Sequence, residues 1–168
     1  MPSPNAAELP NLAEVLSPVL QGVPVEQQPL LIAIAERMAA QRYREWAKDA
    51  AMQRHYAELL ACADREEQIA SRVEGLYPQA AAMQRAIRAN NPNLEETNRT
   101  LFAGRPLAQQ FTIQAQGERL GAATWRAFAR HEQNDARRAA FLACAELEED
   151  SARALDAILD GKRQRKTI

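Results

Sequence analysis

Four glutamates at matched spacing are the residues of this chain best suited to chemistry. Glu36 and Glu66 are 30 residues apart, and Glu118 and Glu148 are separated by the same interval. Apolar or small residues recur every three or four positions around each glutamate, which is the spacing of one helix face. Each of these four stripes contains one of the glutamates. Such carboxylates are expected to point inward, where they bind a cation, pair with arginines or share protons.

An internal repeat relates the same four residues. Shifting the sequence by 82 positions places residues 36–76 on 118–158 without a gap, and 13 of the 41 aligned pairs are identical. A constant offset over this length favours duplication over chance similarity between two alanine-rich amphipathic segments. The repeat pairs Glu36 with Glu118 and Glu66 with Glu148.

Each repeated unit is too long for one ordinary helix, so we expect a helical hairpin in each copy. The polar segment at 133–135 marks the turn of the second copy, and 51–53 is its counterpart in the first. Each glutamate then lies about 15 residues from its turn, or roughly 20 Å along the helix. All four meet at mid-height if the second hairpin enters from the opposite end. The predicted helices are 27–49, 53–76, 107–131 and 135–160.

The remaining segments frame one predicted domain over residues 26–160. Residues 1–25 form a proline-punctuated extension, with one or two helical turns around 11–20. The crossover 77–106 has room for short helices such as 79–89. The basic tail 161–168 is expected to be frayed and solvated, which we prefer to a nucleic-acid contact.

The composition narrows the classes of function. Charged residues make up 26% of the chain and the net charge is −1. This charge balance predicts no overall electrostatic attraction to nucleic acid or to a membrane surface. No apolar run could span a bilayer, the start lacks the features of a secretory signal, and the two cysteines have no Cys-x-x-Cys spacing. We expect a cytoplasmic protein, and no small-molecule substrate is identifiable from the sequence.

The hairpin duplication, the long crossover and one glutamate per helix resemble the ferritin-like superfamily of rubrerythrins and bacterioferritins over about residues 27–160. The resemblance implies an all-α fold, a ferritin-like four-helix bundle built from two duplicated αα-hairpins. It also implies a carboxylate site for iron or manganese, with oxidase, peroxidase or metal-handling activity, and a homodimer. By position, Glu36 and Glu118 match the family's single glutamates, whereas Glu66 and Glu148 match the glutamates of its two Glu-x-x-His motifs.

The chain departs from the family at the histidines of those motifs. Ile69 and Ser151 occupy the two positions, and the neighbouring frame gives Ala70 and Ala152. An all-oxygen site suits Mn²⁺, Mg²⁺ or Ca²⁺ better than a di-iron centre. The only histidines of the chain, His55 and His131, are predicted near the hairpin ends.

The alternative is a non-catalytic scaffold or interaction bundle that has lost the metal site. In that case arginines adjacent in sequence or two turns away would neutralise the glutamates, so the sequence leaves open whether the protein is an enzyme. The candidate arginines are matched by the repeat: Arg37, Arg44, Arg119 and Arg126.

Three further pairs share the inner stripes or lie close to the glutamates. Cys62 and Cys144 are either soft ligands or a redox pair, or, as we prefer, small buried residues. Tyr43 and Trp125 suit electron transfer, although core packing is the commoner role of such aromatic residues. Glu67 and Glu149 adjoin the inner glutamates and are expected to face neighbouring side chains or water.

Overall fold

The computed structural model describes residues 9–165, with side chains up to residue 161, and this part of the chain contains helices and turns but no strand. The all-α prediction is therefore confirmed, as expected for a sequence rich in alanine and long unbranched side chains. The elements in chain order are α1 (Leu12–Gln21), η1 (Val25–Gln27), α2 (Gln28–Lys48), η2 (Ala50–His55), α3 (Tyr56–Glu74), α4 (Ala80–Asn90), α5 (Leu94–Phe102), α6 (Leu107–His131) and α7 (Asp135–Arg165).

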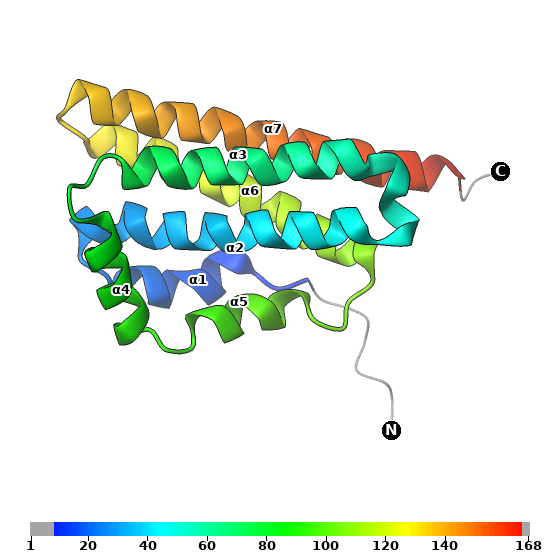
Figure 1. Ribbon diagram of the computed structural model, residues 1–168, viewed down its shortest axis with the longest axis horizontal. Coiled ribbons are helices and arrows are strands. Elements are labelled where there is room, and N and C mark those ends of the chain that lie inside the picture. The colour runs from blue at the N-terminus through cyan, green and yellow to red at the C-terminus, as the bar shows by residue number, and fades with distance from the viewer. Residues whose placement is uncertain (1–8, 166–168) are drawn as a thin grey trace.

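The four long helices form two antiparallel hairpins, α2 with α3 and α6 with α7. The turns of the two hairpins lie at opposite ends of the molecule (Figure 1). The first turn is the 3₁₀ segment η2, whose first residues are held by the Asp49 carboxylate accepting from the Ala51 N–H. In the second turn the Asn134 side chain accepts from the Arg137 N–H and caps α7.

Two helix ends differ from the sequence-based prediction. α3 starts at residue 56, because the 3₁₀ turn takes up the first residues of the predicted helix 53–76. α7 continues to Arg165, whereas we expected fraying from Gly161. One glycine costs a helix only about 1 kcal/mol, and no proline follows to end it. Residues 166–168 of the predicted tail lie outside the described residues.

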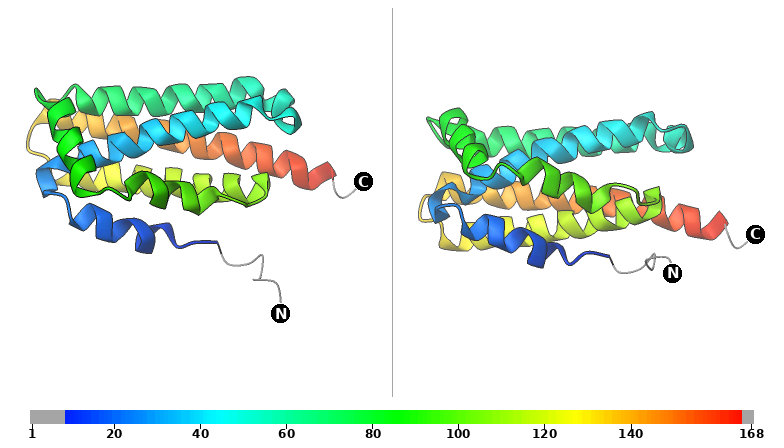
Figure 2. Two further views of the ribbon diagram at one scale, coloured as in Figure 1. Left: turned by 60° about the horizontal axis from the view of Figure 1, so that its bottom comes forward. Right: turned by 90° about the horizontal axis from the view of Figure 1, so that it is seen from below.

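The crossover holds two helices. α4 is close to the predicted 79–89 and crosses one end of the hairpins, and α5 then runs back along their length (Figures 1 and 2). Gly104 has a φ of 74°, a left-handed conformation that glycine adopts without strain, in the turn leading to α6.

The two hairpins contact each other mainly through α3 and α7. On the other side α2 and α6 approach each other less closely, and α1 and α5 both pack against α6 there. Figure 2 shows these two short helices along one side of the long ones. Among the described residues, no helix is long and apolar enough to cross a membrane.

Two apolar clusters fill the interior of the hairpins. One includes Tyr43, Trp46 and Phe111, and the other includes Trp125 and Phe141. On each long helix the inner glutamate lies between residues of the first cluster and residues of the second. The glutamates therefore occupy the boundary between the clusters, at a similar height on all four helices.

Candidate metal centre

The structure brings the four predicted site residues together in the interior. Glu66, Glu118 and Glu148 are at most 1% exposed, and Glu36 is 7% exposed. One carboxylate oxygen from each of Glu36, Glu66 and Glu148 lies within 4.8 Å of the other two. Glu118 adjoins this triad, close enough to Glu148 for a hydrogen bond between the two carboxyl groups. Three carboxylates at this separation can contact one cation.

Burial raises the pKa of three of these carboxyl groups. Loss of water is the largest cause for Glu36, Glu66 and Glu148, and the negative charges of neighbouring glutamates add to it. The pKa values of Glu66 and Glu148 rise well above the ordinary value of 4.5. Without a cation, these groups retain protons that an exposed glutamate would lose.

Hydrogen-bond donors from α2 and α6 hold two of the carboxylates in place. The Tyr43 hydroxyl donates to Glu118 Oε1 at 2.5 Å, and Gln114 Nε2 donates to the same oxygen at 2.8 Å. The Trp125 indole N–H donates to Glu148 Oε1 at 2.8 Å. Tyr43 and Trp125 stand 82 positions apart in matched places of the sequence repeat. Tyr43 donates to a glutamate of the other hairpin, whereas Trp125 donates to one of its own hairpin.

One carboxylate oxygen in the cluster lacks a partner. Ser151 Oγ donates to Glu66 Oε1 at 3.1 Å and accepts from Arg65 Nε at 3.0 Å. Glu66 Oε2 is fully buried, and no N–H or hydroxyl group of the described residues donates to it. The Glu36 carboxyl group lies within hydrogen-bond distance of the Glu66 carboxyl group. Buried polar atoms are nearly always paired, so an unpaired carboxylate oxygen beside two other carboxylates points to a missing cation or proton donor. Ser151, at a position where the ferritin-like resemblance implies a histidine, thus supports Glu66 across the interface of α3 and α7.

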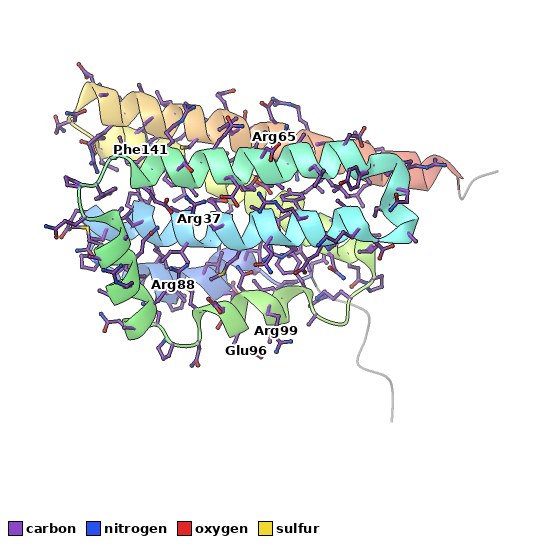
Figure 3. The ribbon with its side chains drawn as sticks, in the orientation of Figure 1. Arg37, Arg65, Arg88, Glu96, Arg99 and Phe141 are labelled. Carbon is purple, nitrogen blue, oxygen red and sulfur yellow. The ribbon has the colours of Figure 1, made fainter. Side chains whose placement is uncertain are left out.

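The four arginines considered from the sequence do not neutralise these glutamates. Arg37 pairs with Glu67 and Glu74, and Arg44 also pairs with Glu67. Figure 3 shows Arg37 on α2, next to α3. In the second hairpin, Arg119 pairs with Asp156, and Arg126 pairs with Glu146 and with Glu149.

The arginine-neutralisation hypothesis is therefore wrong for these residues. Throughout the described part of the chain, none of the four inner glutamates has a basic side chain within ion-pair distance. The adjacent glutamates outside the cluster, Glu67 and Glu149, instead form ion pairs with Arg37, Arg44 and Arg126. Pairing with Arg126 lowers the pKa of Glu149.

The remaining sequence candidates lie outside the cluster. His55 is in the turn η2 and pairs with Glu58, and His131 ends α6. Cys62 and Cys144 are buried free thiols, and burial raises the pKa of Cys144 to about 12. A thiol with that pKa does not ionise near neutral pH, which agrees with the packing role preferred above. Ile69 is fully buried in the same apolar cluster as Trp125.

Sequence reasoning missed Gly121. A Cβ atom at this position would lie 2.7 Å from the Cδ atom of Glu148, closer than such contacts normally come. The glycine therefore makes room for the Glu148 carboxyl group. The signal available in the sequence was a small residue in both copies at one inner position, Ala39 and Gly121, one turn after a glutamate.

No protein-family model, curated protein or solved structure matches this chain.

Proposed function

We propose that this chain is a ferritin-like protein that binds a divalent metal ion, manganese or iron, between Glu36, Glu66 and Glu148, with Glu118 beside them. The unpaired, fully buried Glu66 Oε2 within a cluster of carboxylates is the observation that carries the proposal. A cation would supply the partner that the oxygen lacks and would offset the mutual repulsion of the four acids. Oxygen donors alone suit Mn²⁺ and other hard cations.

The hydrogen-bond donors around the cluster would position the ion by orienting the carboxylates, and they would stabilise these carboxylates in the ionised form. Tyr43 and Gln114 donate to Glu118, and Trp125 donates to Glu148, so two carboxylates are oriented before any metal arrives. The ion would supply the redox or Lewis-acid chemistry of an oxidase, a peroxidase or a metal-handling protein. The proposal also includes a homodimer, which the resemblance to the ferritin-like superfamily implies.

The second candidate is a non-catalytic ferritin-like scaffold that has lost the metal site. The specific observation in its favour is that Ile69 and Ser151 stand at the histidine positions and fit there, one in the apolar cluster and the other bonded to Glu66. In that case the inner glutamates would stay protonated and bond to one another.

Equilibrium dialysis against Mn²⁺ and, without oxygen, against Fe²⁺ separates the two candidates. We expect the wild type to retain metal and Glu66→Gln/Glu148→Gln to lose it, because each amide removes a charged ligand. The matched control is Glu67→Gln/Glu149→Gln, which changes the adjacent, outward-facing glutamates and should bind like the wild type. Equal retention by the inner and outer variants, or none by the wild type, would exclude the metal site.

A substitution away from the ligands gives a second prediction. Gly121→Ala is expected to weaken Mn²⁺ binding by about tenfold or more, because the added methyl group displaces the Glu148 carboxyl group. Gly117→Ala is the control on the same helix, since its methyl group would meet only Leu12 Cδ1, at 3.6 Å. Circular dichroism checks that both variants remain helical. Unchanged affinity in Gly121→Ala would show that the position of Glu148 does not matter for binding.

A further inference from the structure

A cavity of about 310 Å³ lies beside the carboxylate cluster, on the side where α2 and α6 diverge. α1 and α5 contribute to its walls, and side chains such as Leu16, Leu20, Leu31, Leu101 and Ile113 make most of them apolar. Glu36, Glu118 and Glu148 also line it. The carboxylate cluster and the cavity are therefore continuous.

One end of the cavity carries a positive charge. Arg42 lines the cavity, and its guanidinium group donates to Gln114 Oε1 at 2.6 Å and to Asn98 Oδ1, with the Phe102 ring centroid 3.8 Å away. Burial lowers the pKa of Arg42 to about 10, so it remains cationic at neutral pH. Among the described residues no carboxylate lies within ion-pair distance of it. With five N–H donors, the guanidinium group has capacity for an anion.

The same end opens toward the surface. Arg42, Asn98 and Phe102 also line a second, more open hollow, together with polar and charged residues that include Gln41, Glu45, Glu95 and Arg99. Arg42, Asn98 and Phe102 therefore lie between the apolar cavity and this second hollow. A molecule with its head at Arg42 would keep that head near water while its tail lay in the cavity.

We propose that the cavity binds an unbranched aliphatic carboxylate of medium length, with its carboxylate at Arg42 and its tail between α1, α2, α5 and α6. A group the size of a water molecule takes up about 30 Å³, so the cavity holds on the order of ten carbon atoms. Along α2, Arg42 lies about 9 Å from Glu36 and about 16 Å from Leu31, at 1.5 Å per residue. The middle of the chain would therefore pass the carboxylate cluster.

The acids on the cavity wall are compatible with an anionic ligand. Glu36 lies about 9 Å along α2 from Arg42, and the Glu148 carboxylate is held by the Trp125 indole N–H. Both acids therefore lie along the tail of the proposed ligand and not at its head group. This inference adds a ligand to the proposed metal site but does not require metal, and it can therefore fail independently of that proposal.

The test is isothermal titration of chelator-treated, full-length protein with decanoate, 1-decanol and decylamine. We expect decanoate to bind at one site, about tenfold or more tightly than 1-decanol. Arg42→Gln should lose this preference, whereas Arg42→Lys should keep most of it and Arg44→Gln all of it. Tighter binding of decylamine would place the head group at the glutamates and overturn the assignment to Arg42.

A second pair of variants tests the cavity. Ala35 lines it, so Ala35→Phe should fill part of the volume and weaken decanoate binding by about tenfold or more. Ala61→Phe adds the same ring at an exposed position on α3 and should leave binding unchanged. If Ala35→Phe binds decanoate like the wild type, or if the wild type binds none, the cavity is not the site.

Discussion

Metal-free protein is expected to lose unfolding free energy as the pH rises from 5 to 8, and Glu66→Gln is expected to lose measurably less over the same range. The pKa of Glu66 in the folded protein lies well above the unfolded value of 4.5. Between these two pKa values the folded state binds more protons than the unfolded state, so stability falls as pH rises. Each group that titrates in this way costs about 1.4 kcal/mol per pH unit.

The glutamine variant is chosen to keep the contacts of Glu66 while removing its charge. Its amide oxygen still accepts from Ser151 Oγ, and its amide nitrogen can donate to Glu36. Urea unfolding at several pH values measures the effect. Glu67→Gln is the control, since its glutamate lies outside the cluster in ion pairs with Arg37 and Arg44. Parallel pH profiles for wild type and Glu66→Gln would show that Glu66 does not hold a proton.

Adding Mn²⁺ is expected to stabilise the wild type and to release protons. At a metal concentration 100 times the Kd the gain is about 2.7 kcal/mol, which raises the Tm of a chain of this size by roughly 5–10 °C. Protons are released because carboxyl groups with raised pKa values must ionise to bind the ion, so affinity rises with pH.

Two measurements check this pair of effects. Thermal unfolding with and without Mn²⁺ gives the shift in Tm, and titration calorimetry in buffers of different ionisation enthalpy gives the number of protons released. Glu66→Gln/Glu148→Gln should show neither effect, and Glu67→Gln/Glu149→Gln should show both. A Tm shift of the same size in the inner variant would place the bound metal elsewhere.

The placement of the glutamates was largely predictable from the sequence because it depends on local periodicity. Helical spacing assigned each glutamate to an inner face, and equal distances from the turns put them at one height. The ends of α3 and α7 were harder to predict, since a 3₁₀ turn and a tolerated glycine leave little trace in sequence. α1 and α4 lie close to their predicted positions, whereas α5 was not specified.

The surroundings of the site depended on tertiary packing that the sequence did not reveal. Arg42 has Thr124 as its repeat counterpart, so the duplication gave no reason to single it out. The cavity arises from the divergence of α2 and α6 and from the helices that line it, which periodicity does not encode. Arg37 and Arg119 were misassigned because sequence adjacency to an inner glutamate does not place a side chain on the inner face.

A crystal of the full chain grown with MnCl₂, with diffraction recorded on both sides of the manganese absorption edge, tests the metal site most directly. We expect one dominant anomalous peak between the carboxylates of Glu36, Glu66 and Glu148, at coordination distances from their oxygens. A map from the same crystals with no anomalous peak at this position, in which the carboxyl groups are hydrogen-bonded to one another, would contradict the proposed metal site.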